Sequence, residues 1–183
     1  LTYGGTLNHG VNGVGGLNSP SSITISPDYN HAYVTADVNN SVSWFNRNSA
    51  TGALTYGGTL EQGVNGVDGL TGAENIIGTN NHIYVTSKQN NSVSYFARNA
   101  TTGELNYGGT LTNGVNNIDG LGGASSISIS KDGARAYVTA SSDDTLNWMN
   151  RDVNTGALTY VGGIKNRSGV RIFGEGYRPP KFK

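Results

Sequence analysis

Asparagine and aspartate side chains recur at equivalent positions in this sequence, where they could bind a polyhydroxylated ligand. These positions form three sets: Asn12, Asn65 and Asn116; Asp68 and Asp119; and Asn40, Asn91 and Asp144. Amides donate and accept hydrogen bonds and carboxylates accept them, so both suit the hydroxyl groups of a sugar. Several equivalent weak sites on one rigid scaffold would bind with avidity. We therefore predict that these are ligand-binding residues. The alternative is that they stabilise turns, because Asn and Asp tolerate a left-handed backbone.

Residues suited to catalysis are sparse. His31 and His82 occupy equivalent positions, and Arg135 takes the third. A position that accepts His or Arg favours a solvated strand edge over a catalytic site. A hydrolase needs a base near its substrate and often a metal ion, yet the His, Asp and Glu residues show no metal-ligand spacing. We predict no catalytic residue, no metal site and no cofactor.

These residues recur because the sequence itself repeats. The segment LTYGGTL at 1–7 returns at 54–60, at 105–111 with one change, and loosely at 158–164. A Tyr-Val-Thr triplet begins at Tyr33, Tyr84 and Tyr137. The period of about 52 residues is typical of a propeller blade.

Each repeat predicts four short strands. In the second copy they cover 74–78, 82–87, 92–98 and 105–111, which are rich in Val, Ile, Thr and Tyr and are separated by turn residues. The adjacent Trp44 and Phe45 must point to opposite faces of their strand, so both faces carry large apolar groups. A blade between two other blades buries both faces. The fold class is therefore all-β: a β-propeller of four-stranded antiparallel blades.

Composition excludes several other classes of protein. The 183 residues suit one domain, and the formal net charge of zero argues against nucleic-acid binding. No stretch approaches the ~20 apolar residues of a membrane span. The absence of Cys excludes disulfide scaffolds and thiolate sites. The abundance of Asn, Gly, Ser and Thr favours an extracellular or cell-surface location.

The repeat resembles the YVTN-type repeats of the lactonase-like β-propeller family. The segments that carry the resemblance are ISPDYNHAYVT, ISKDGARAYVT and FARNATTGELNYGGTL. The resemblance covers residues 1–164 and implies blades with the first strand innermost and the fourth outermost. Because the family includes sugar-lactone hydrolases and surface-layer proteins, it implies a fold more firmly than a function.

The predicted organisation is a repeat region at 1–164, with blades at about 22–60, 73–111 and 125–164, and a non-repeat basic tail at 165–183. Residues 1–7 are expected to form one orphan outer strand. Three blades do not easily close a ring, so we predict a homodimer that closes six blades. The alternatives are a fragment of a larger propeller, or a fourth blade built from the tail and the first strand.

The equivalent arginines Arg47, Arg98 and Arg151 are expected to lie across neighbouring blades and to pair with a turn carbonyl or an acid. Trp44 and Trp148 are expected in the core, because they lie mid-strand. For function, we predict a non-enzymatic binding propeller that recognises carbohydrate through its repeated rim loops. Its partner would be a glycan or a surface protein. The alternatives are a sugar-lactone hydrolase and a structural cell-surface scaffold.

Overall fold

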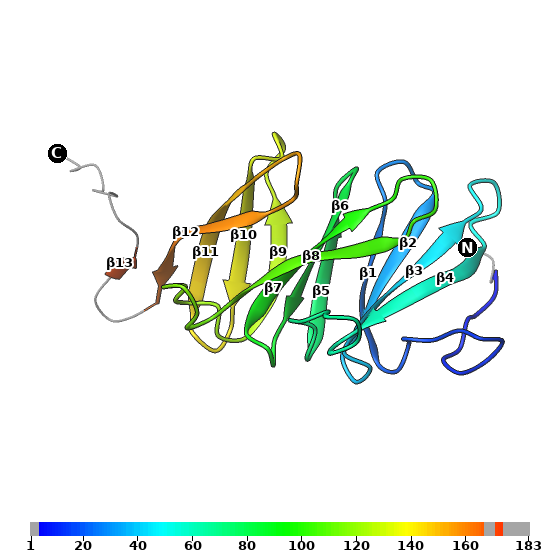
Figure 1. Cartoon of the computed structure of the whole chain (residues 1–183), viewed down its shortest axis with the longest axis horizontal. Helices are drawn as coiled ribbons and strands as arrows, with labels where there is room; N and C mark the ends of the chain where they lie inside the picture. Colours follow the sequence, from blue (N-terminus) through cyan, green and yellow to red (C-terminus); the bar gives the residue numbers. More distant parts are fainter. Residues whose placement is uncertain (1–3, 167–170, 174–183) are drawn as a thin grey trace.

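The computed structural model describes residues 4–166 and 171–173, and in this part of the chain the regular structure is β-strand. Three antiparallel sheets stand side by side, each built on four consecutive strands, and the third sheet has a fifth strand at its edge (Figure 1). Blade 1 contains β1 (Pro20–Ile25), β2 (His31–Ala36), β3 (Ser41–Arg47) and β4 (Leu54–Glu61). Blade 2 contains β5 (Ala73–Gly78), β6 (His82–Ser87), β7 (Ser92–Arg98) and β8 (Leu105–Thr112). Blade 3 contains β9 (Ala124–Ile129), β10 (Arg135–Ala140), β11 (Thr145–Arg151) and β12 (Leu158–Lys165). The expected four-stranded antiparallel blades are confirmed.

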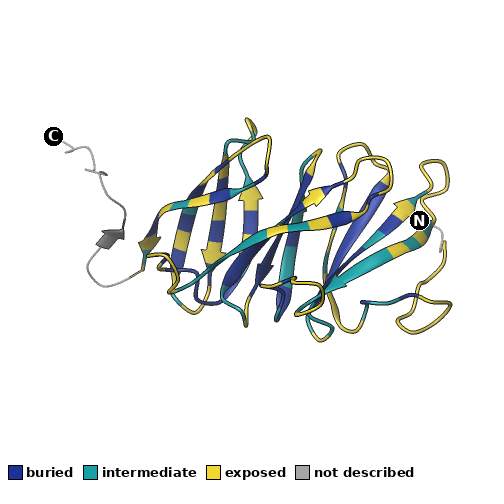
Figure 2. Ribbon diagram, in the orientation of Figure 1, coloured by how far each residue is buried: buried dark blue, intermediate teal, exposed yellow. Residues whose placement is uncertain are grey.

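Apolar side chains fill the spaces between blades. One cluster joins Tyr33 and Val42 of blade 1 to residues such as Phe96 of blade 2, and a second joins Tyr84 of blade 2 to Met149 of blade 3. Neighbouring blades also meet at their first strands, since β1 contacts β5 and β5 contacts β9. Figure 2 shows buried residues in all three blades, mostly on their second and third strands. Blade 2 is therefore covered on both faces.

The glycine pairs of the fourth strands create room for aromatic rings. Gly57 lies opposite a register shift between Trp44 and Phe45, and a Cβ on Gly57 would lie 2.5 Å from Trp44 Cδ1. Gly108 lies in the same way beneath Tyr95. These pairs therefore combine a β-bulge with a close approach of the backbone to an aromatic ring. Trp44 and Trp148 are half-buried rather than fully in the core.

The two ends of the row expose apolar surface. Ile23 of blade 1 is 58% exposed, whereas its equivalent Ile76 is 5% exposed. On blade 3, Tyr137 is 42% exposed although its equivalents Tyr33 and Tyr84 are fully buried. These two surfaces are called the end faces below.

The segments outside the repeats differ from expectation. Residues 4–7 are not in a strand and instead line a cavity of about 570 Å³ against blade 1, so the described part of 1–7 does not form the orphan strand. In the tail, β13 (Arg171–Phe173) pairs with β12. The described part of the tail thus extends blade 3 and does not join residues 4–7 in a fourth blade. The remainder, 167–170 and 174–183, lies outside the described residues.

The connections divide between two rims. One rim, called the long-loop rim, carries the blade-to-blade connections 62–72 and 113–123 and the turns between the second and third strands of each blade. These parts meet where Asn40 Oδ1 accepts a hydrogen bond from Gly72 N at 2.8 Å. The opposite rim, called the short-turn rim, carries the remaining turns. Across the described residues, no helix is long and apolar enough to cross a membrane.

Candidate functional site

The asparagines of the long loops lie in tight turns. Asn65 and Gly66 have φ of 51° and 79°, and Val67 N donates to Val64 O at 3.0 Å. This geometry is a type I′ turn, which requires positive φ at both central residues and therefore favours Asn-Gly. The same turn recurs at Asn12 and at Asn116. All three side chains are exposed. Turn geometry accounts for Asn at these positions, and ligand binding there stays a prediction.

The residues of the second-to-third-strand turns hold neighbouring blades together. Asn91 Oδ1 accepts from Gly123 N at 2.7 Å, as Asn40 does from Gly72. Asn40, Asn91 and Asp144 all have φ between 52° and 55°. Asn40 and Asn91 thus link each blade to the connection that leads into the next one, while the equivalent Asp144 is exposed on blade 3.

The loop aspartates have different surroundings. Asp68 Oδ1 accepts from Gln62 Nε2 and from Gly69 N, both at 2.8 Å. The exposed Asp119 contributes its backbone carbonyl to Tyr160 OH. All eight predicted residues lie on the long-loop rim. In the described part of the chain, no hydrogen bond joins one of these eight side chains to another.

A β-bulge at the start of each first strand aims one side chain out of the ladder. The bulged residue is Ser21 in blade 1, Glu74 in blade 2 and Ser125 in blade 3. Ser21 Oγ donates to Thr35 Oγ1 at 2.9 Å, and Ser125 Oγ lies 3.1 Å from Thr139 Oγ1. Bulges of this kind commonly redirect a side chain next to an active site. In blade 2 the redirected residue is Glu74, a charged residue where the other two blades have serine.

The exchange of serine for Glu74 removes a repeated hydrogen bond. Thr86 is the counterpart of Thr35 and Thr139, and its buried Oγ1 has no hydrogen-bond partner. The neighbouring Ser87 Oγ is also buried without a partner. A buried polar atom without a partner is unfavourable and calls for an explanation. Sequence reasoning missed Glu74, although its departure from an otherwise serine position was visible in the repeat.

A second departure lies beside the first. Directly after the second strand, the repeat places Asp37, Lys88 and Ser141 at equivalent positions. Lys88 is exposed, and its backbone N donates to Gly72 O at 2.9 Å, two residues before Glu74. Gln89 Nε2 donates to Asp37 Oδ1 at 3.3 Å across the blade junction. The inner part of the long-loop rim therefore carries both acidic and basic groups around blade 2.

On the short-turn rim, an arginine crosses each blade junction. Arg98 donates to Tyr33 OH, Asn80 O and Asp28 Oδ2, each at 2.7 Å, and lies 2.8 Å from His31 Nδ1. The expected pairing of Arg98 with a turn carbonyl and an acid is confirmed. Hydrogen bonds from Ser26 and Arg98 outweigh the effect of burial and lower the pKa of Asp28 to about 2.

The expectation that His31 and His82 lie at a solvated edge is wrong, because each is only 3% exposed. Burial, followed by the charge of the neighbouring arginine, lowers the pKa of both imidazoles. The misleading signal was Arg135, which is exposed because blade 3 has no following blade among the described residues. The burial of this position therefore depends on the next blade.

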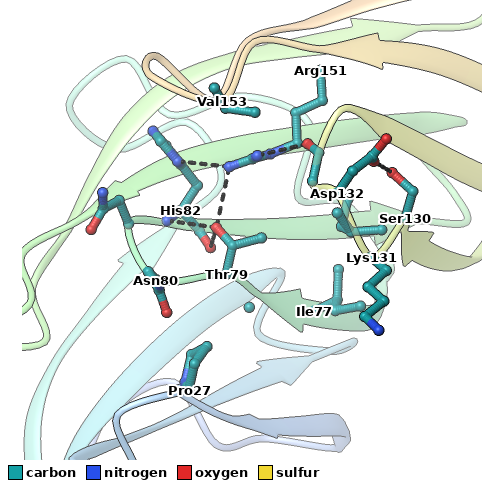
Figure 3. A pocket seen from close by; sticks show the side chains of 14 residues that line it. Pro27, Ile77, Thr79, Asn80, His82, Ser130, Lys131, Asp132, Arg151 and Val153 are labelled. Atoms are coloured by element: carbon teal, nitrogen blue, oxygen red, sulfur yellow. Dashed lines mark hydrogen bonds between the residues drawn. The ribbon is translucent and has the colours of Figure 1, made fainter.

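The junction between blades 2 and 3 opens into a pocket of about 460 Å³ (Figure 3). Arg151, His82 and Thr79 form one wall, and the turn with Lys131 and Asp132 forms another. Arg151 Nη1 donates to Gly133 O at 2.9 Å, which confirms the expected turn-carbonyl contact. Within residues 4–166, no group of three or more His, Asp or Glu side chains is placed to hold a metal ion.

Comparison with solved structures shows the same fold in longer chains. The periplasmic gluconolactonase of Pseudomonas aeruginosa superimposes with a TM-score of 0.67 at 20% identity, over 84% of this chain and 42% of that chain. A candidate 6-phosphogluconolactonase of Bacteroides fragilis matches with a TM-score of 0.65 at 21% identity, over 80% of this chain and 39% of that chain. The chain thus spans about two fifths of these proteins.

No curated protein matches the sequence. The family model described as "Lactonase, 7-bladed beta-propeller" matches residues 75–171, which is more than half of the chain. The repeated blades, their inner-strand contacts and this match agree: the chain belongs to the lactonase seven-bladed β-propeller family.

Proposed function

We propose that this chain belongs to a sugar-lactone hydrolase whose reacting groups lie at the inner end of blade 2 on the long-loop rim. The observation that carries the proposal is Glu74, which replaces a repeated serine and leaves Thr86 Oγ1 buried without a partner. Residues that break a favourable local interaction without an evident structural gain are found mainly at functional sites. The gluconolactonase names of two structural relatives support the substrate class.

The chemistry needs a base and a positive charge. Water attacks the ring carbonyl of the lactone, an oxyanion forms, and the ring oxygen leaves as a hydroxyl when it takes up a proton. A carboxylate can accept the proton of the attacking water, and a nearby cation stabilises the oxyanion. We assign the first role to Glu74 and the second to Lys88, whose backbone is tied to the same loop.

The test is the rate of acid release from glucono-1,5-lactone, followed in a pH-stat against the spontaneous rate. Glu74→Gln is expected to lower kcat by about a hundredfold or more, and Lys88→Ala should also lower it. Glu104→Gln is the matched control, because Glu104 is an exposed carboxylate on the opposite rim. Equal rates for Glu74→Gln and Glu104→Gln would remove Glu74 from the mechanism, and no rate above background would reject the activity.

The second candidate is carbohydrate binding without turnover, through the exposed type I′ turns at Asn12, Asn65 and Asn116. Their exposure and their repetition on one rim favour it. An extracellular or cell-surface location with a glycan or surface-protein partner belongs to this candidate. Titration of the protein with gluconate and with neutral monosaccharides separates the two. Binding of neutral sugars that survives Glu74→Gln, without lactone turnover, would favour recognition over hydrolysis.

A further inference from the structure

Equivalent arginines cross the two blade junctions, but their partners differ. At the first junction, Arg98 is only 6% exposed and forms an ion pair with Asp28 at 2.7 Å. At the second, Arg151 is 8% exposed. The turn of blade 2 is two residues shorter than that of blade 1 and has no counterpart of Asp28, because Thr79 takes the place of Ser26. Arg151 Nη2 lies 3.3 Å from Thr79 Oγ1 and 3.0 Å from His82 Nδ1. Among the described residues, Arg151 has no carboxylate within ion-pair distance.

A buried cation without a counter-ion is unfavourable. The remaining contacts of Arg151 are neutral: it donates to Tyr84 OH and to Gly133 O. One N–H of Nη1 has no acceptor among these contacts, and the Nη2 bond to Thr79 is long. The guanidinium therefore keeps donor capacity toward the pocket that it lines.

The pocket surroundings suit an anion. Lys131 adds a second positive charge at the opposite wall (Figure 3). The carboxylate of Asp132 is engaged with its own turn, since Oδ1 accepts from Ser130 Oγ at 2.5 Å and from Ala134 N at 3.0 Å. His82 Nδ1 faces Arg151, so the neutral imidazole serves as an acceptor there. The volume of about 460 Å³ accommodates a small organic anion.

We propose that the pocket between blades 2 and 3 binds a small oxyanion, a carboxylate or a phosphate group, which pairs with Arg151 where Asp28 pairs with Arg98 at the first junction. Lys131 Nζ is the further group placed to contact it, since Thr79 Oγ1 already donates to His82 O and accepts from His82 N, both at 3.2 Å. This site lies on the short-turn rim, away from Glu74 and Lys88, so it stands whether or not the lactone-hydrolase proposal holds. The ligand would stabilise the junction by the charge pairing that the chain itself provides at the other junction.

Two variants, one at each junction, test the proposal. Thr79→Asp places a carboxylate in the site, so it should weaken anion binding by about tenfold or more. Asp28→Thr removes the carboxylate from the first junction, so it should create a second site and raise the stoichiometry from one to two. Thr79→Ser keeps the hydroxyl and is the matched control, which should bind as the unaltered chain does.

Binding is measured by NMR titration of the ¹⁵N-labelled chain with sodium acetate and with inorganic phosphate, with sodium chloride as the ionic-strength control. The His82 imidazole and the Thr79 amide are expected to shift with acetate, phosphate or both. The tighter of the two identifies the ligand as carboxylate or phosphate. Equal titrations of the unaltered chain and Thr79→Asp would overturn the proposal, as would the absence of specific shifts well above ~1 mM. Because Thr79→Asp adds a charge pair, it remains informative even if Asp28→Thr does not fold.

Discussion

Glu74 and Thr86 form the point at which the second repeat departs from the other two. In blades 1 and 3 the bulged serine hydroxyl meets a threonine hydroxyl, and in blade 2 that contact is missing. Blade 2 thus combines a carboxylate at the bulge with a buried hydroxyl that has no partner. The exchange that supplies the carboxylate of the proposed function is expected to reduce stability.

Glu74→Ser should restore the repeated hydrogen bond to Thr86. We expect the free energy of unfolding to rise by about 1 kcal/mol, because a buried unpaired hydroxyl costs about that much. Urea unfolding followed by tryptophan fluorescence measures it. Glu104→Ser, at an exposed turn, is the control and should change little. An unchanged urea midpoint for Glu74→Ser would show that Thr86 finds its partner in another way.

Asn65 gives a second test at this scale. Asn65→Ala should lower the free energy of unfolding by about 1 kcal/mol, because its φ of 51° is unfavourable for alanine. Asn65→Gly should be nearly neutral for stability, because glycine adopts this φ freely. Calorimetric unfolding measures both. If Asn65→Gly folds normally yet binds sugar as before, Asn65 has only the turn role.

Individual residues were predictable where one repeat alone determines them. The turn chemistry of Asn12, Asn65 and Asn116 follows from local sequence, and so do the strand positions of the arginines. The burial of His31 and His82 was not predictable in that way, because it depends on the blade that follows. The pocket at Arg151 also needed the structure, since it arises at a junction between two repeats where the shorter turn of blade 2 has no counterpart of Asp28.

At the scale of elements, the strands follow closely from the periodic sequence. Alternating apolar positions determine which face of the sheet each side chain occupies. The Gly-Gly pairs indicate the bulge in the fourth strand. The unrepeated segments gave no such signal. Residues 4–7 share the sequence of a fourth strand but have no preceding third strand to pair with, and β13 has no counterpart in any repeat.

The blade junctions should make stability depend on pH. The pKa of His31 and of His82 is lowered in the folded chain, so the unfolded chain takes up protons first as pH falls through the ordinary value of about 6.5. Stability is therefore expected to decrease below that pH. The groups facing His31 are Arg98, Asp28 and Asn46, and those facing His82 are Arg151, Asp152 and the Thr155 backbone.

Asp28 adds a second decrease between about pH 4 and its folded pKa of about 2, where the unfolded carboxyl is protonated before the folded one. Urea unfolding at pH 7.5, 5.5 and 3 measures both steps. His82→Gln should reduce the loss of unfolding free energy between pH 7.5 and 5.5. Asp28→Asn should reduce the further loss between pH 5.5 and 3. A stability that stays constant from pH 7.5 to 5.5 would contradict the buried, neutral histidines.

For the whole molecule, the sequence predicted three blades and the structure confirms them, whereas ring closure stays a prediction. Each end face carries one half of an arginine–tyrosine contact that the internal junctions complete. Blade 1 presents Arg47, whose Nη1 donates to the local Tyr29 O at 2.9 Å, and blade 3 presents the exposed Tyr137. At both internal junctions an arginine in the position of Arg47 meets a tyrosine in the position of Tyr137. We propose that a second copy covers the end faces through this contact.

Light scattering coupled to size exclusion measures the outcome. We expect a mass of twice 19.1 kDa, and Tyr137→Asp should shift it toward the monomer, because a charge would then lie in the apolar contact. Arg135→Ala, at a neighbouring exposed position, is the control. A monomeric unaltered chain would reject the second copy as the occupant. A ladder of larger species would indicate that the contact repeats without closing.

Among the described residues, blade 2 has a neighbour on each side, and the apolar clusters that join the blades run between adjacent sheets. Such a linear array opens from its termini, since removing an outer sheet breaks one junction and removing the central sheet breaks two. Amide hydrogen exchange should then be slowest in β6 and β7 and faster toward both ends. Limited proteolysis should cut first in the outer sheets. Glu74 lies in the central blade, so its surroundings should be the last part of the chain to unfold.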